Sequence, residues 1–235
     1  MLKFGFAAAA LASFAFISSA QADTVVFQSG DFTNFFTPFD SSSSSDNLFA
    51  DSGWFGSGSD AGVVLKDITL HLVTFSDSGL PMSAGTTDIN FTFNDGDPSG
   101  DIFGTAAELY STTLTNVVLP AASGVSPTAF DLTIPLPGVF TLGGFNNVGF
   151  SIGVENFDFD GSFGFQTSEQ FNYVGFYTEL ASEYEAGDWS QFSFGPNPFT
   201  NMNDMANLRM TITAPEPATL SVLAGAGLIA LRRKR

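Results

Sequence analysis

The oxygen-rich loop at residues 94–101 is the first segment whose residue types could do chemistry. Its sequence, Asn-Asp-Gly-Asp-Pro-Ser-Gly-Asp, places Asp95, Asp97 and Asp101 within eight residues. Because Ca²⁺ takes about six to eight hard oxygen ligands, these three carboxylates are candidate calcium ligands. Asp-Gly and Asp-Pro are also common in hairpin turns, and the spacing departs from the EF-hand pattern, so a plain turn is the alternative. Asp158 and Asp160 form a second, weaker candidate.

Four aromatic residues could stack on sugar rings, because each offers an apolar face with a polar edge group. They are Trp54, Tyr173, Tyr177 and Trp189. Apolar residues fall on both sides of the segment 171–177 when it is drawn as a strand. Filling of the core is therefore the alternative interpretation for these aromatic side chains.

Two patterns would suit a hydrolase. The segment 149–153 has the form G-x-S-x-G around Ser151, but a nucleophile elbow needs a sharp turn followed by a helix, and this segment alternates like a strand. His71 is the only histidine, so any Ser-His-Asp arrangement would have to use it. Alternation places His71 with Thr69 and Val73 on an outward strand face. We therefore assign no catalytic residue and expect a protein that is not an enzyme.

A glycosidase would need two carboxylates about 5–10 Å apart. Glu155, Glu179, Glu183 and Glu185 are the best placed along the chain. With 24 acidic residues present, some pair falls at that separation by chance. A secreted glycoside-active enzyme therefore stays an alternative without an assigned acid.

In the segments that must position these residues, apolar and polar side chains alternate with a period of two, which is typical of half-buried strands. Turn chemistry rich in Gly, Pro, Asn and Asp separates them. We predict an all-β fold, an antiparallel β-sandwich with jelly-roll-like connectivity, in which residues 28–62 are an irregular entry segment. The expected strands lie at 24–28, 66–72, 88–94, 114–119, 129–134, 147–154, 161–166, 172–178, 190–194 and 208–213.

Charge and cysteine content exclude several function classes. Between residues 23 and 216 only Lys66 and Arg209 offset 24 acidic residues, which gives a net charge of −22. Such a surface lacks the cations that phosphate contacts require, so nucleic acid is excluded as a partner. The absence of cysteine and the single histidine exclude thiolate and His-rich metal sites. The 28 phenylalanines are the expected core material.

The first 22 residues predict a secretory signal peptide. Lys3 provides a positive start, residues 4–17 are apolar, and Ala20 and Ala22 fit a cleavage site before Asp23. Fourteen apolar residues would span only about 21 Å as a helix, which is short of the roughly 30 Å hydrocarbon core of a membrane. Removal by signal peptidase is therefore preferred over a permanent anchor.

The last 21 residues have three features in order. Pro215, Glu216 and Pro217 are followed by an apolar run at 218–231 and then by four cations. The prolines end any helix, and the cations would hold the tail on the cytoplasmic side. A short transmembrane helix that serves as a transient stop in the inner membrane is expected, with an ordinary tail anchor as the alternative. The cations are Arg232, Arg233, Lys234 and Arg235.

These three features resemble the PEP-CTERM sorting signal of Gram-negative bacteria. The resemblance covers only about the last twenty residues and leaves the body unassigned. It implies processing by an exosortase-like membrane protease, and a secreted or cell-surface location in a bacterium that makes exopolysaccharide or biofilm. Within this pattern Glu216 would belong to the recognition motif.

The predicted organisation is a signal peptide at 1–22, a β-sandwich domain at 23–213 and a sorting signal at 214–235. The expected function is that of an exported, non-catalytic surface or extracellular-matrix protein with a structural or adhesive role. One alternative is a carbohydrate-binding module that binds exopolysaccharide, with calcium as a candidate cofactor. The other alternative is the glycoside-active enzyme.

Overall fold

The computed structural model describes most of the predicted body. The described residues are 23–39, 48–55, 64–76, 78–96, 107–139, 147–168, 173–174, 176–177, 182–185, 188–191, 193–196, 203–205 and 207–215. In these ranges the regular elements are strands, and the strand pairings are antiparallel. The prediction of an all-β, antiparallel, sandwich-like fold is confirmed.

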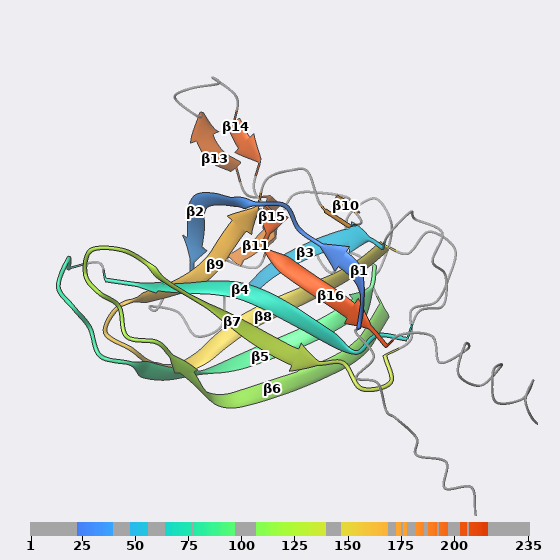
Figure 1. Ribbon diagram of the computed structural model, residues 1–235, viewed down its shortest axis with the longest axis horizontal. Helices are drawn as coiled ribbons and strands as arrows, with labels where there is room; N and C mark the ends of the chain where they lie inside the picture. The colour runs from blue at the N-terminus through green and yellow to red at the C-terminus, as the bar shows by residue number, and fades with distance from the viewer. Residues whose placement is uncertain are drawn as a thin grey trace, which may run out of the picture.

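Two seven-stranded sheets form the body, and a two-stranded sheet is added to it (Figure 1). Sheet A contains β1 (Thr24–Gln28), β2 (Phe32–Pro38), β4 (Asp67–Phe75), β7 (Thr128–Pro135), β9 (Ser162–Ser168), β15 (Asn207–Leu208) and β16 (Met210–Ala214). Sheet B contains β3 (Leu48–Trp54), β5 (Gly85–Asp95), β6 (Ala107–Leu119), β8 (Asn147–Asp158), β10 (Phe176–Tyr177), β11 (Ser182–Glu185) and β12 (Asp188–Gln191). The small sheet pairs β13 (Ser193–Pro196) with β14 (Asn203–Met205).

Strand β4 is the centre of sheet A because three strands pair with it. It pairs with β7 over residues 67–74, from Asp67 opposite Pro135 to Thr74 opposite Thr128. It also pairs with β16 over residues 67–70 and with β9 over residues 72–75. The change from β16 to β9 falls at residue 71, which makes this position a junction of three chain segments.

The prediction that residues 28–62 form an irregular entry segment is wrong in one respect. Two strands, β2 and β3, lie within residues 28–62, where we expected irregular structure. Strand β3 has the sequence LFADSGW, which does not alternate, so pattern reasoning does not identify it. Its buried Asp51 accepts hydrogen bonds from the backbone N–H of Ser52 at 2.8 Å and of Leu208 in sheet A at 2.7 Å. These bonds supply partners that a buried carboxylate requires.

The core lies between sheets A and B and is built from the alternating residues. On three of the predicted strands the described apolar residues of one alternating face are buried, as expected from their period, while the side chain of Val148 on β8 lies outside the described residues. Each such side chain contributes roughly 1.5–3 kcal/mol through burial. These residues are Ile68, Leu70 and Leu72 on β4, Ile89, Phe91 and Phe93 on β5, and Phe150, Ile152 and Val154 on β8.

Aromatic contacts join the two sheets. Phe39, which follows β2, lies 4.6 Å from the Phe49 ring of sheet B and 4.9 Å from the Phe163 ring of sheet A, centroid to centroid. Its backbone N–H donates to the Phe163 carbonyl at 2.8 Å. Edge-to-face and offset ring pairs add to the stabilisation from burial alone. Phe39 therefore fixes the start of the β2–β3 connection to both layers.

Two bulges lie beside the first half of β5, one on each neighbouring strand. The β5–β6 register shifts between Thr87 and Ile89, and the β5–β8 register shifts between Thr86 and Asp88. The extra residues include Asn116 on β6 and Asn156 on β8, both with positive φ (55° and 48°). Asparagine tolerates this left-handed conformation better than most residues, which explains its use at both bulges.

Candidate functional site

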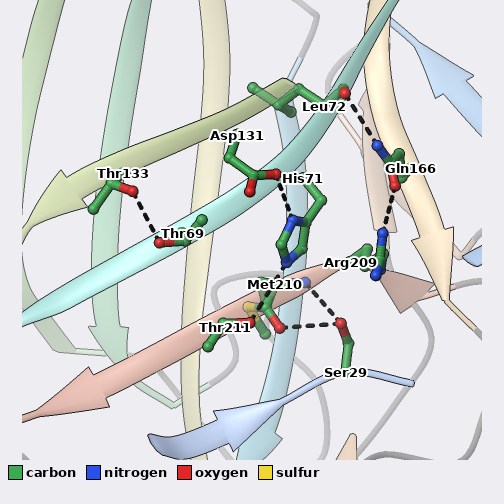
Figure 2. A network of polar contacts seen from close by, with 10 residues as sticks. All are labelled: Ser29, Thr69, His71, Leu72, Asp131, Thr133, Gln166, Arg209, Met210 and Thr211. Carbon is green, nitrogen blue, oxygen red and sulfur yellow. Dashed lines mark hydrogen bonds and ion pairs between the residues drawn. The ribbon is translucent and has the colours of Figure 1, made fainter. Parts of the chain in front are cut away.

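The strongest cluster of polar side chains lies on sheet A at the junction in β4 (Figure 2). The backbone N–H of His71 donates to the Arg209 carbonyl at 3.1 Å, and the N–H of Arg209 donates to the Gln166 carbonyl at 2.9 Å. These two bonds continue the sheet between β4, β9 and the β15–β16 segment. The three side chains are therefore positioned by backbone pairing and not by a loop.

His71 lies between a carboxylate and a hydroxyl. Its Nδ1 lies 2.7 Å from Asp131 Oδ1 on β7, and its Nε2 lies 3.5 Å from Thr211 Oγ1 on β16. Asp131 is directly opposite His71 in the β4–β7 register, so the contact follows from the pairing. The order carboxylate, imidazole, hydroxyl is that of a Ser-His-Asp site, with threonine in the serine position. The hydroxyl contact is at the long limit for a hydrogen bond.

The predicted solvent-facing His71 is more covered than expected. Its side chain is only 17% exposed, whereas that of Asp131 is 62% exposed. The neighbours on β7 and β16 flank the imidazole on both sides, which a single-strand pattern could not show. Val73, predicted on the same outward face, is also buried.

Gln166 connects the junction to the backbone of β4. The side chain is 3% exposed, and its Nε2 donates to the Leu72 carbonyl at 3.2 Å. Its Oε1 accepts a hydrogen bond from Arg209 Nη1 at 2.7 Å. A buried amide needs both kinds of partner, and this arrangement provides them. Two residues before His71 on β4, the Thr69 hydroxyl lies 3.0 Å from the Thr133 hydroxyl on β7.

The contacts in this cluster run mostly between neighbouring strands. Each of the pairs His71–Asp131, Thr69–Thr133 and Gln166–Arg209 joins two different chain segments. Cross-strand polar pairs contribute modestly to sheet stability, by about 0.2–1 kcal/mol each. These polar contacts therefore connect β7, β4, β9 and β16 to one another.

Ser151 lies within β8, which pairs with β3 on one side and β5 on the other. It is opposite Ala50 and opposite Thr92. The G-x-S-x-G segment is thus a strand, as predicted, and not a nucleophile elbow.

The candidate calcium residues are only partly described. Asp95 is the last residue of β5, while Asp97 and Asp101 lie outside the described residues. Among the described residues no group of three or more His, Cys, Asp or Glu could hold a metal ion. Asp158 and Asp160 border an open cavity of about 390 Å³, whose apolar wall includes Val118 and Phe159.

The four candidate stacking residues do not form one described surface. Trp54 is opposite Phe176 in the β3–β10 pair, and Tyr177 is the residue that follows Phe176 on β10. Tyr173 is 62% exposed, and its hydroxyl donates to Asp31 Oδ1 at 2.7 Å. Trp189 lies on β12 opposite Tyr184. The side chains of Tyr177 and Trp189 lie outside the described residues.

Comparison with protein-family models, curated proteins and solved structures finds no match to this chain.

The terminal segments that carry the sorting and cleavage predictions are mostly outside the described residues. Asp23 and Pro215 are described and exposed, whereas Ala20, Ala22, Glu216, Pro217 and the basic cluster are not described. No helix in the described part of the chain is long and apolar enough to cross a membrane. Both predicted apolar segments, at 4–17 and 218–231, fall outside that part.

Sequence reasoning missed Gln166, Asp51 and Asp88, each of which accepts or donates at least two hydrogen bonds in the described part of the chain. Gln166 and Asp51 are buried, and their partners come from strands far away in the chain. The available signal was a polar residue inside an otherwise apolar segment, as in the sequence Phe-Gly-Phe-Gln at 163–166.

Proposed function

We propose that this chain is an exported, non-catalytic protein with a structural or adhesive role at the cell surface or in the extracellular matrix. In this proposal a signal peptidase removes residues 1–22, and an exosortase-like enzyme processes the tail after a transient stop in the inner membrane. The proposal includes a jelly-roll-like description of the body. The chain alternates between the sheets, from β4 in sheet A to β5 and β6 in sheet B, back to β7 and on to β8, which supports that description.

One observation carries the proposal. Strand β1 begins at Thr24, one residue after the predicted cleavage site, and β16 ends at Ala214, one residue before the Pro-Glu-Pro motif. Thr24 and Ala214 are directly opposite each other in the β1–β16 pair. The two predicted processing sites therefore flank the folded body at one corner. Cleavage at both sites would leave the sheets intact.

Lys66 reinforces this corner. Its ammonium group forms an ion pair with Asp23 and lies 3.6 Å from Asp67 Oδ2, and its backbone N–H donates to the Thr213 carbonyl at 2.9 Å. The hydrogen bond to Asp23 raises the pKa of Lys66. These contacts hold the first residue of the predicted mature chain next to the last strand, which supports a body that ends at this corner.

The test uses the full chain expressed in an exosortase-carrying Gram-negative host. Changing Pro215, Glu216 and Pro217 together to alanine should stop tail processing and leave the protein in the inner-membrane fraction. A matched control changes Val125, Ser126 and Pro127, an exposed Pro-containing loop in the body, to alanine. Equal release of the wild-type and tail-variant proteins into the medium would contradict the proposal.

A carbohydrate-binding role is the second candidate, and Tyr173 favours it. A 62% exposed aromatic ring beside the Asp31 carboxylate combines a stacking face with a hydrogen-bonding group. The experiment is a pull-down of the full chain on the host's exopolysaccharide. Tyr173→Ala should lower retention, whereas Val64→Ala, also at an exposed apolar residue, should not. Equal retention of both variants would count against this role.

A further inference from the structure

Strand β6 forms one edge of sheet B, opposite the edge formed by β12 (Figure 1). It is 13 residues long, and within the described part of the chain it pairs only with β5. An edge strand presents a row of unpaired backbone N–H and C=O groups, which can pair with another strand. Natural edge strands are usually protected by lysine, proline, inward charges or bulges.

Residues 110–114 of β6, which lie between a bulge at Leu109 and the bulge that contains Asn116, have none of these protections. Glu108 is the only charged residue of β6 and is the second residue of the strand. The bulge that contains Asn116 comes after Leu114, so the ladder with β5 is regular from Tyr110 to Leu114. The free edge is therefore uncharged and regular over its central part.

The same segment has apolar side chains that sheet B does not fully cover. Tyr110 and Leu114 are opposite the buried Phe93 and Ile89 of β5, so they point toward the core side. Both are only partly buried against the core. A further strand placed beside β6 would remove more of their apolar surface from water.

The edge that β7 forms in sheet A is better protected. Strand β7 also ends its sheet, but it carries Asp131 near its middle and ends at Pro135. A negative charge in the middle of a strand would oppose a second copy of the same strand. The contrast makes β6, and not β7, the edge suited to pairing.

We propose that β6 pairs edge to edge with β6 of a second copy of this chain, antiparallel and centred on Thr112. Thr112 is the midpoint of the regular run 110–114. In this register Tyr110 faces Leu114 of the second copy, and Ser111 faces Thr113. Aromatic–aliphatic and Ser–Thr pairs are both favourable across strands, so the segment is complementary to itself.

Charge selects the antiparallel arrangement. A parallel, in-register pair would place Glu108 opposite Glu108, which is destabilising. The antiparallel pair centred on Thr112 separates the two Glu108 positions by eight residues, or about 27 Å. That separation exceeds the Debye length of about 8 Å at physiological ionic strength. The net charge of −22 on each body still opposes association, so pairing should strengthen as salt is added.

Cysteine cross-linking tests the register. Because the chain has no cysteine, any disulfide dimer must come from an introduced residue. Thr112→Cys in the full chain, held in mild detergent, should form disulfide dimers on mild oxidation, since directly opposed strand residues are close enough for a disulfide. Ser126→Cys, an exposed position in the loop after β6, is the control. Cross-linking at residue 112 that is no greater than at residue 126 would overturn the proposal.

Charge substitution tests the same edge without oxidation. Ser111→Glu combined with Thr113→Glu places like charges directly opposite each other in the proposed pair. Sedimentation of the full chain should show a dissociation constant raised at least about tenfold. The loop variant Ala121→Glu with Ser126→Glu adds the same charge at exposed positions and should not weaken pairing by that amount. Equal weakening by both double variants would contradict the proposal.

The inference goes beyond the proposed role in export, because edge pairing depends on the folded body alone. A chain that is exported and processed but does not cross-link would contradict only the pairing. A chain that cross-links but keeps its full length in the host would contradict only the processing.

Discussion

Asp88 Oδ2 accepts a hydrogen bond from the side-chain amide of Asn156 at 2.6 Å, across the β5–β8 pair. The other carboxylate oxygen accepts the backbone N–H of Asn116 on β6 at 2.7 Å. One side chain on β5 therefore stabilises bulges on both neighbouring strands. At the β6 bulge the carboxylate supplies a partner for a backbone N–H, and at the β8 bulge it accepts from the side chain of the bulged asparagine.

Asp88→Asn should destabilise the fold at neutral pH, because an amide cannot accept hydrogen bonds with both of its terminal atoms. The bond from Asn156, followed by that from Asn116, lowers the pKa of Asp88. A depressed folded-state pKa contributes stability above the unfolded-state pKa, near 4, and that stability is lost as pH falls through the folded-state pKa.

The measurement is urea unfolding of the wild type and of Asp88→Asn between pH 7 and pH 2. The difference between their unfolding free energies should be constant near neutral pH and vanish in acid. Asp160→Asn, an exposed carboxylate in the turn after β8, is the control and should show little difference. A difference for Asp88→Asn that grows as pH falls would contradict this account.

Gly124 is required for a close backbone approach between two loops. Its φ is +79°, and a Cβ there would lie 2.5 Å from the carbonyl carbon of Leu80. Gly138 has a similar φ of +73° but open space around it. Gly138→Ala should therefore cost about 1–2 kcal/mol for the left-handed conformation alone. Gly124→Ala should cost more in thermal unfolding, and equal costs would show that the loops adjust freely.

Phe39→Ala should lower the free energy of unfolding by about 3–5 kcal/mol, because it leaves a cavity between the two sheets. Phe39 is 3% exposed and contacts the rings of Phe49 and Phe163. Phe39→Leu keeps most of the volume and should cost less than half as much. Guanidinium unfolding measures both variants, and a cost below about 1 kcal/mol for the alanine variant would contradict the placement of Phe39 in the core.

Gln166→Leu should cost about 1–3 kcal/mol, because it leaves the buried Leu72 carbonyl and the Arg209 guanidinium each without one partner. The comparison is Thr69→Val, which removes an exposed cross-strand contact with Thr133 and should cost about 0.5 kcal/mol. Chemical denaturation of both variants checks the order. A smaller effect at residue 166 than at residue 69 would count against the role of Gln166 at the junction.

The sequence predicts those strands in which apolar and polar side chains alternate, because one face of each strand is buried and the other faces solvent. Strands β4, β5 and β8 follow this rule, and their inward residues are buried. Strand β3 does not alternate, since Asp51 and Ser52 are buried through hydrogen bonds that depend on distant segments. The pairing of His71 with Asp131 likewise depends on strand register, which a single strand pattern does not specify.

The site at the junction was partly predictable for the same reason. His71 is identifiable as the only histidine, but its partners on β7 and β16 follow from pairings between segments 60 and 140 residues away. The two bulges next to Asp88 also have no local pattern beyond asparagine at residues 116 and 156. Long-range register therefore limits what the sequence alone reveals of the polar network.

The intact mass of the protein recovered from the culture medium tests the central proposal most directly. The account predicts a chain that begins at Asp23, next to the first strand, and that lacks the apolar segment 218–231 and the basic cluster. Recovery of the full-length mass from the cytosolic fraction, with none in the medium, would contradict it.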